Sequence, residues 1–403
     1  MNTVTRRPLD GVRILDLTRV LSGPFCTALL ADIGAEVIKI ESPAGDDQRH
    51  MGAMRNGRSI NFELINRNKK SLCADLKSAA GQAAIADLVP HCDVVVENFR
   101  PGVAARLGLG PEALCALRPD LIHCSISGFG QAGPLAARPS YDVVAQAMSG
   151  FMSVTGEPDG PPVFAGDSIG DTVPGLYAAW AICAALFRRE RTGQGERIDI
   201  SMFDSLFSLL PTALSQYQLT GKAPPRTGAN HPLSAPFGAY RAGDGYFVLA
   251  VANGALFRKL SAAIGAPELP DDPRFASDQA RRTNEPALRA VIEAWAAPLG
   301  AAEAIARLEA EGIPAAPIWD LAQAARSPQI AARQLLCRRE TAALGALDLP
   351  EQPALFASYA RGAQAPAPDL GADTADILAT VAGWDQARIA AFVDLASTLK
   401  ETD

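Results

Sequence analysis

The chain has 403 residues, a formal net charge of -7, and a composition in which 48% of residues are hydrophobic. This length is sufficient for two domains with a sizeable core. The acidic balance excludes a general nucleic-acid-binding surface, which requires clustered positive charge. The seven cysteines are odd in number and form no CxxC pair, which favours a reduced, cytoplasmic location. The polar start, with Arg6, Arg7 and Pro8, is not the apolar segment expected of a signal peptide.

Strand and helix patterns alternate in the first half of the chain. Short β-rich runs are predicted at 12–17, 36–41, 71–76, 93–97 and 121–126, with helices at 22–33, 78–89 and 111–117. Short apolar strands separated by helices indicate an α/β fold with a mostly parallel sheet that is covered on both faces.

The second half begins with two apolar helices, predicted at 172–190 and 202–219, around a strand at 197–201. The apolar part of the first, 173–187, is short for a bilayer and indicates a buried core helix, so no membrane contact is expected. A Pro/Gly-rich linker, a hairpin at 237–250 and helices at 254–264, 284–310 and 384–399 follow. We therefore expect a large domain in 1–221, a small domain with linkers in 222–325, and a C-terminal segment, 326–403, that returns to the large domain.

Two familiar kinds of site have weak support. Gly128–Gly133 matches GxGxxG, but Pro134 and Pro139 interrupt the helix that a dinucleotide fingerprint must open, so a tight loop or simple turn is favoured. The four histidines lie in no hydrolase signature, and HExxH and paired CxxC motifs are absent from the sequence. No metal site is predicted.

Basic residues gather near the ends of the predicted strands, which is notable in an acidic chain. They are Lys39, Arg49, Arg55, Arg58, Arg67, Lys69, Lys70, Lys77, Arg100 and Arg106. Two interpretations have similar weight: a solvated surface, or a pocket for a polyanionic ligand at the carboxyl ends of the strands.

Asp171 is the most informative single residue. It lies in a glycine-flanked stretch, 165–175, where an extended segment gives way to the long apolar helix. A carboxylate at a helix start can cap the helix or attack an acyl group, and the rest of the chain favours attack.

Several motifs in order resemble class III CoA-transferases, the CaiB/BaiF family of formyl-CoA transferase and carnitine CoA-transferase. The motifs are Pro8–Asp16, Ser22–Cys26, Leu30–Glu41, Asn68–Ser71, Val96–Gly102, Gly128–Gly130, Thr192–Gly195 and Gly312–Pro314. The resemblance implies a subunit with a large Rossmann-like domain and a smaller α+β domain, and two ring-shaped subunits interlocked as a homodimer. It places the nucleophile on Asp171 rather than on Asp167, four residues earlier, since the Asp-x-x-x-Gly spacing ends at Gly175.

The resemblance also implies a set of CoA contacts and no cofactor beyond CoA as substrate. The contacts fall on Val20, Leu21, Ser22, Ser42, Ala74, Asp75, Leu76, Lys77, Asn98, Phe99, Arg100, Arg106, Arg138, Tyr141 and Asp142. Ser42 replaces an arginine of the formyl-CoA enzyme, and that enzyme's glycine-rich lid has no counterpart at 228–236. Formyl transfer to oxalate is therefore disfavoured.

The implied reaction is CoA transfer from an acyl-CoA donor such as succinyl-CoA to a small carboxylic or dicarboxylic acid, through an aspartyl-CoA thioester. An α-methylacyl-CoA racemase is one alternative, but Tyr141 stands where its histidine base belongs, and a phenol with a pKa near 10 is a poor base at pH 7. A non-catalytic acyl-CoA-binding protein is the other.

Overall fold

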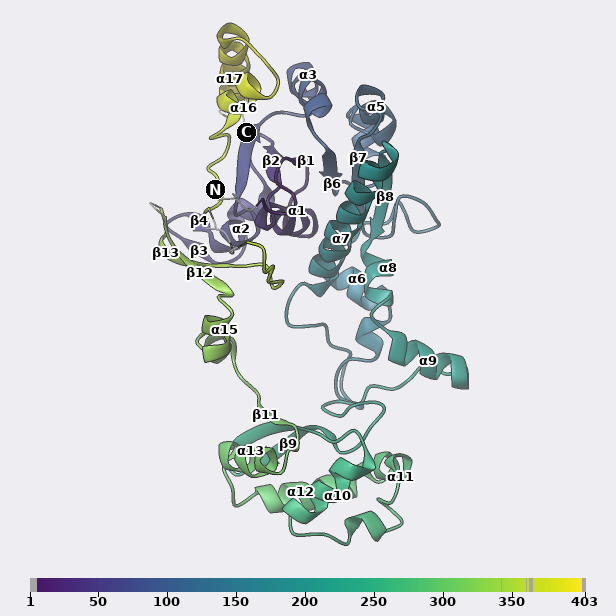
Figure 1. The fold of residues 1–403 in the computed structure, drawn as a ribbon. Coiled ribbons are helices and arrows are strands. Elements are labelled where there is room, and N and C mark those ends of the chain that lie inside the picture. The colour runs from purple at the N-terminus through teal and green to yellow at the C-terminus, as the bar shows by residue number, and fades with distance from the viewer. Residues whose placement is uncertain (1–5, 342, 360, 362–364, 401–403) are drawn as a thin grey trace. The chain divides into compact units, whose positions relative to one another are not determined.

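The computed structural model describes residues 6–400 except 342, 360 and 362–364. These residues form two compact units (Figure 1). The first comprises Met1–Phe151, Phe164–Pro211 and Pro328–Asp403, and the second Met152–Val163 and Thr212–Ser327. In this grouping the segment 152–163 and almost all of the helix at 211–220 belong to the second unit, whereas the sequence boundaries placed both in the first.

A six-stranded, all-parallel sheet forms the centre of the first unit. Its strands are β1 (Arg13–Asp16), β2 (Glu36–Glu41), β5 (Lys69–Cys73), β6 (Val94–Glu97), β7 (Ile122–Ser127) and β8 (Glu196–Ser201). They lie in the order β5-β2-β1-β6-β7-β8. This confirms the predicted α/β class with a parallel, Rossmann-like sheet.

Successive strand residues point to opposite faces of the sheet. Each face therefore packs its apolar side chains against a different set of helices. Leu15 and Ile38 pack with α3 (Ala79–Leu88), α5 (Pro111–Leu117), α16 (Thr374–Thr380) and α17 (Gln386–Lys400). Their neighbours Ile14 and Val37 pack with α1 (Ser22–Asp32) and α7 (Ile169–Thr192). The C-terminal segment therefore completes one face of the core.

The remaining elements of the first unit are short. They are η1 (Asp47–His50), β3 (Met54–Arg55), β4 (Arg58–Ser59), α2 (Ile60–Ile65), η2 (Val89–His91), α4 (Val103–Arg106), α6 (Asp142–Met148), α8 (Met202–Phe207), α15 (Pro328–Ala332), β12 (Leu336–Thr341) and β13 (Gly345–Pro350). Two more elements, η3 (Phe151–Ser153) and α9 (Pro211–Thr220), begin at the boundary, and most of their residues belong to the second unit. The single helix predicted at 202–219 was wrong: Pro211 begins a new helix after a break, as its ring and missing N–H require.

The second unit has a three-stranded antiparallel sheet in the order β11-β10-β9. Its elements are β9 (Phe237–Ala242), β10 (Gly245–Ala250), α10 (Gly254–Ala263), η4 (Leu269–Asp271), α11 (Asp278–Thr283), α12 (Glu285–Ala296), α13 (Ala301–Ala310), β11 (Ala315–Pro317) and α14 (Leu321–Ala325). The predicted hairpin at 237–250 is confirmed by the pairing of β9 with β10. The helix predicted at 284–310 is two helices, because Pro298 and Gly300 fall between α12 and α13.

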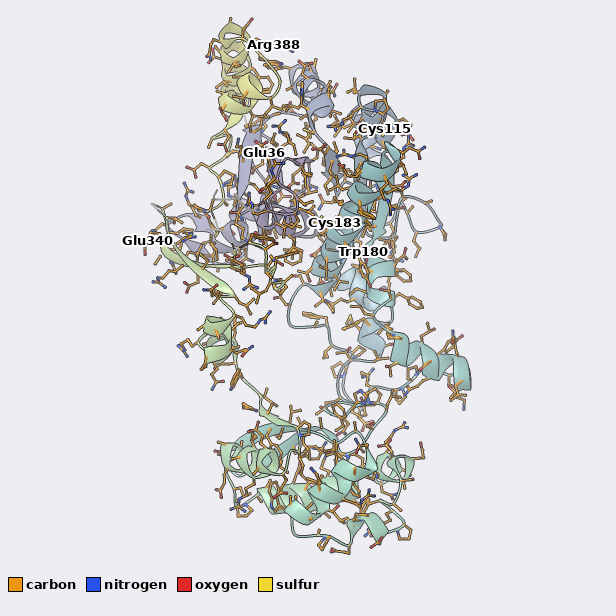
Figure 2. All side chains as sticks on the ribbon, viewed as in Figure 1. Glu36, Cys115, Trp180, Cys183, Glu340 and Arg388 are labelled. Atoms are coloured by element: carbon orange, nitrogen blue, oxygen red, sulfur yellow. The ribbon has the colours of Figure 1, made fainter. Side chains whose placement is uncertain are left out.

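Helix α7 is longer than predicted, with 24 residues. Among the described residues it is the one helix long and apolar enough to cross a membrane by length and composition, and 44% of its most apolar stretch is buried inside the fold, as in a core helix. Leu176, Trp180 and Phe187 lie on its outer side and are 58%, 67% and 64% exposed. Figure 2 labels Trp180 on this helix.

Candidate active site

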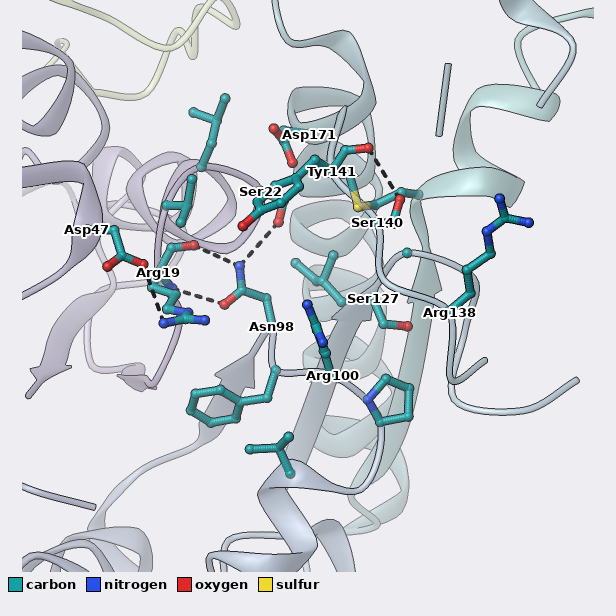
Figure 3. A pocket seen from close by; sticks show the side chains of 18 residues that line it. Arg19, Ser22, Asp47, Asn98, Arg100, Ser127, Arg138, Ser140, Tyr141 and Asp171 are labelled. Carbon is teal, nitrogen blue, oxygen red and sulfur yellow. Dashed lines mark hydrogen bonds and ion pairs between the residues drawn. The ribbon is translucent and has the colours of Figure 1, made fainter. Parts of the chain in front are cut away.

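A pocket of about 270 Å³ lies at the carboxyl ends of β1, β6 and β7. In the sheet, β2 lies on one side of β1 and β6 on the other, so the order of the strands reverses direction at β1. Such a switch point in a parallel sheet leaves a crevice in which ligands bind. The lining residues are Arg19–Ser22, Asp47, Asn98–Pro101, Val103, Ile126–Gly128, Arg138, Ser140, Tyr141, Asp171 and Met202. Figure 3 shows the side chains of these residues.

Asp171 reaches this pocket from the first turn of α7. Helix α7 crosses α1 closely: a Cβ on Gly175, one turn after Asp171, would lie 2.6 Å from the Ser22 carbonyl oxygen. A larger residue at position 175 would separate the two helices. The Asp-x-x-x-Gly spacing therefore has a packing reason, since the glycine lets Asp171 approach the start of α1.

The electrostatics of Asp171 are unusual for a carboxylate at a helix start, where the dipole favours the anion. Burial raises its pKa to about 7, and the neighbouring Asp142 charge adds to the rise. No described residue donates a hydrogen bond to its carboxylate. Asp171 is therefore a half-buried carboxylate that faces a cavity and forms no ion pair with any described residue, which is the environment of a reactive group.

Asp142 and Asp167, the two nearby carboxylates, have different surroundings. Asp142 accepts hydrogen bonds from the Gly170 N–H at 2.6 Å and from Gln146 Nε2 at 2.9 and 3.0 Å, so it anchors the start of α7. Asp167 is exposed, bonds the Ser168 N–H and does not line the pocket. Of the two carboxylates weighed as nucleophile, the structure brings only Asp171 to the pocket.

Three arginines line the pocket, Arg19, Arg100 and Arg138, and all are exposed. Arg19 lies 3.3 Å from Asp47. Within the described part of the chain, Arg100 and Arg138 form no ion pair. The pocket thus combines one carboxylate of raised pKa with guanidinium groups that can bind phosphate or carboxylate.

The predicted basic cluster does not form one pocket. Several of its members are committed to ion pairs within the fold: Lys39 with Asp46, Arg49 with Glu41, Arg58 with Asp369, Arg67 with Asp32, Lys69 with Asp16 and Lys70 with Glu36. Of the ten, only Arg100 lines the pocket. The polyanion interpretation of the cluster as a whole was wrong, because most of these charges are satisfied internally.

The predicted CoA contacts divide into two groups. Val20, Leu21, Ser22, Asn98, Phe99, Arg100, Arg138 and Tyr141 line the pocket with Asp171, whereas Ser42, Ala74, Asp75, Leu76, Lys77, Arg106 and Asp142 are not among its lining residues. The sequence interpretation missed Arg19, Ser127 and Met202. Arg19 and Ser127 follow or end parallel strands, and the rule that ligands bind at these strand ends could have found them.

The GxGxxG stretch forms an irregular loop. Gly130 and Gly133 have φ values of 84° and 99°, and the Gln131 N–H is held by Asp199 at 2.9 Å. The next helix, α6, begins only at Asp142, so the loop does not open a helix as the dinucleotide fingerprint requires. Among the described residues there is also no group of three or more potential metal ligands.

Comparison with protein families matches residues 9–374 to CoA-transferase family III. The chain is 44% identical over 354 residues to acetyl-CoA:oxalate CoA-transferase of Acetobacter aceti, covering 87% of this chain and 90% of that relative. It is 39% identical to succinyl-CoA–D-citramalate CoA-transferase of Chloroflexus aurantiacus, covering 94% of each. Among solved structures, a CAIB/BAIF family protein from Brucella suis has a TM-score of 0.83 and 38% identity, covering 93% of this chain and 100% of that one.

Proposed function

Because the chain belongs to CoA-transferase family III, we propose that it moves CoA from an acyl-CoA to a small dicarboxylic acid, with Asp171 as the covalent nucleophile. The observation that carries the proposal is the position of Asp171: a carboxylate in the first turn of α7 that lines the pocket and accepts no hydrogen bond from a described residue. Burial, which raises its pKa to about 7, agrees with this role. Two relatives are named for CoA transfer with oxalate and with D-citramalate. Both acids are dicarboxylates, which supports a dicarboxylate as the acceptor. Succinyl-CoA or acetyl-CoA is the proposed donor.

The first half-reaction loads Asp171. One carboxylate oxygen attacks the thioester carbonyl carbon, the C–S bond breaks, and CoA leaves as the thiolate, which gives a mixed anhydride. The thiolate then attacks Cγ of Asp171, the anhydride C–O bond breaks, and the donor acid leaves as its carboxylate. Asp171 now carries CoA as a thioester.

The second half-reaction reverses these steps with the acceptor. Its carboxylate attacks Cγ of Asp171, expels the thiolate and forms a second anhydride. The thiolate attacks the acceptor's acyl carbon, which releases the new acyl-CoA and restores the Asp171 carboxylate. No net proton or electron is consumed, so no cofactor beyond CoA is needed. Both half-reactions exchange a thioester for a thioester and are therefore nearly isoenergetic.

The surroundings of Asp171 suit this role. A carboxylate stabilised by several hydrogen bonds would be a weak nucleophile, whereas one destabilised by burial and by Asp142 is more reactive once ionised. We propose that Arg19, Arg100 and Arg138 bind the anionic groups of CoA or of the acid. The predicted contacts outside the lining, Ser42, Ala74–Lys77, Arg106 and Asp142, remain proposals for the outer part of CoA.

Transfer and racemisation make opposite predictions for the α-carbon. With a chiral 2-methylacyl-CoA in deuterated water, we expect no α-deuterium, because the aspartyl route confines chemistry to the carbonyl and Tyr141 is a poor base. The same enzyme should transfer CoA from succinyl-CoA or acetyl-CoA to oxalate or citramalate, and mass spectrometry should detect the new acyl-CoA. Deuterium uptake without CoA transfer would establish the racemase alternative. If the protein binds CoA but catalyses neither reaction, the result would favour the non-catalytic alternative.

We propose that the protein is a homodimer of interlocked subunits in a reducing cytoplasm, where its seven free thiols would persist. The exposed apolar residues Leu176, Trp180 and Phe187 on α7 support a second copy as the partner.

Wild-type protein should sediment as a dimer at micromolar concentration without dissociating on dilution. Trp180→Asp should yield monomer, because it places a charge on this surface, whereas Leu117→Asp, at an exposed apolar residue of α5, should not. A wild-type monomer would contradict the proposal.

A further inference from the structure

The segment between β1 and α1 has an uncommon backbone conformation. Val20 has a φ of 65°, in the left-handed region that favours glycine and is costly for a β-branched residue. Val20 and its neighbours Arg19, Leu21 and Ser22 all line the pocket that contains Asp171. Strain of this kind persists only where the surrounding structure holds it in place.

Hydrogen bonds from distant elements hold the segment on both sides of Val20. The Val20 N–H donates to Asp46 Oδ1 at 2.9 Å, and the Arg19 N–H donates to Asn98 Oδ1 at 2.9 Å. Asn98 Nδ2 in turn donates to the Arg19 carbonyl and to Ser22 Oγ, as Figure 3 shows. Lys39 Nζ donates to the Thr18 carbonyl at 2.9 Å. The backbone therefore has little freedom to relax.

A buried ion pair connects two of these contacts. Lys39 Nζ lies 2.8 Å from Asp46 Oδ2, and the two side chains are 0% and 1% exposed. Burial lowers the pKa of Lys39, but the charges of Asp46, Asp16 and Glu41 together more than offset that effect, so the pKa is raised. Burial likewise raises the pKa of Asp46, but Lys39 and the N–H groups of Gln48 and Val20 together lower it below its ordinary value. A buried ion pair generally stabilises a fold no more than well-packed apolar side chains do, so its role here requires another explanation.

We propose that Lys39 and Asp46 are positioning residues, which hold Val20 in its left-handed conformation so that residues 20–22 line the pocket in their binding geometry before acyl-CoA arrives. The inference rests on the proposed function, because its benefit is faster CoA transfer. The Ser22 carbonyl packs against Gly175, one turn after Asp171. Relaxation of the segment would therefore change the alignment of a bound thioester relative to Asp171.

Val20→Gly tests the proposal directly. Glycine adopts a positive φ without penalty and lets the segment relax, so we expect the melting temperature to stay near that of the wild type while kcat/KM for transfer falls between about 10- and 100-fold. Val20→Ala keeps the Cβ and the backbone restriction, and should lose much less. Equal losses in the two variants would show that the Val20 methyl groups act by direct contact, and would overturn the proposal.

Gln334→Gly is the matched control, because Gln334 also has a positive φ of 49° but is exposed and does not line the pocket. It should change neither stability nor transfer appreciably.

A second experiment combines Lys39→Met with Asp46→Asn, which removes both buried charges and keeps an oxygen that can accept a hydrogen bond from the Val20 N–H. This pair should reduce kcat/KM, and adding Val20→Gly should cause little further loss, since both act on one segment. Full additivity would contradict a shared mechanism.

The wild type is measured alongside with the same donor and acceptor. If the wild type transfers CoA and Val20→Gly transfers it equally well, the positioning proposal fails and the proposed function stands. If the wild type transfers no CoA, the proposed function fails, and calorimetric affinity for CoA decides the positioning proposal: Val20→Gly should bind CoA more weakly than Gln334→Gly, and equal affinities would overturn it.

Discussion

Asp171→Asn should abolish CoA transfer, with kcat reduced by about four orders of magnitude or more, as for other covalent nucleophiles. The amide has nearly the same size and fills the same space, but it cannot form an anhydride with the acyl group. CoA affinity measured by calorimetry should stay close to that of the wild type, because the arginines and the segment 19–22 are unchanged. Peptide mapping after hydroxylamine treatment with acyl-CoA should show modification of Asp171 in the wild type alone.

Asp167→Asn is the control for this substitution. Asp167 is exposed and lies four residues earlier, in the loop before α7, so its variant should keep most of its activity. Turnover near the wild-type value in Asp171→Asn would exclude the aspartyl route.

Asp171→Asn should also change the thermal stability of the fold in a pH-dependent way. Burial raises the folded-state pKa of Asp171 from an ordinary value of 3.8 to about 7, so the folded state holds this proton more tightly than the unfolded state does. Its ionisation therefore destabilises the fold increasingly as pH rises from about 4 to about 7. Asp171→Asn should have a higher melting temperature than the wild type at pH 8 and little advantage at pH 4.

The second large effect concerns the pH dependence of activity. Since only ionised Asp171 attacks the thioester, kcat/KM should fall about tenfold for each pH unit below the pKa near 7, which amounts to about 100-fold at pH 5. The measurement needs a donor that does not titrate in this range and an acceptor acid that stays ionised. A rate that is flat from pH 8 to pH 5 would contradict the raised pKa.

Asp142→Asn separates the two causes of that raised pKa. Burial is the larger cause and the Asp142 charge the smaller, so removing the charge should move the acidic limb to lower pH without returning it to 3.8. Asparagine keeps a carbonyl oxygen for the Gly170 N–H, which preserves the start of α7. An unmoved limb would mean that Asp142 acts only as an anchor for the helix.

Much of the large unit could be predicted from local pattern. The β-branched runs at 36–41 and 93–97 match β2 and β6. Residues 94–96 are continuously apolar, as a parallel strand buried on both faces is expected to be, whereas β2 also contains Lys39 and Glu41, which are buried in ion pairs. Helix ends were less predictable. Pro211 and Pro298 break patterns whose apolar spacing continues through them, and α7 begins three residues earlier than predicted because Asp142, 28 residues away, accepts from the Gly170 N–H.

The site depended more heavily on long-range contacts. The prediction of Asp171 as nucleophile used its spacing to Gly175, and the structure supplies a packing reason for that spacing. Lys39 and Lys69 were grouped with the possible ligand-binding charges, since their partners Asp46 and Asp16 come into contact only when the strands assemble. The strained conformation of Val20 leaves no signal in residue type, because glycine or asparagine is the usual sign of a positive φ and valine is not.

The packing of the C-terminal segment against the sheet bears on how the protein is made. The core that includes Leu15 and Ile38 also requires Leu378, Trp384 and Phe392, so one face of the sheet stays open until the ribosome has synthesised almost the whole chain. The second unit, apart from 152–163, is contained in 212–327 and can collapse while the chain is still growing. Order of biosynthesis thus favours completion of the smaller unit first, and leaves the larger unit, with its apolar strands exposed longest, as the part most in need of chaperones during translation.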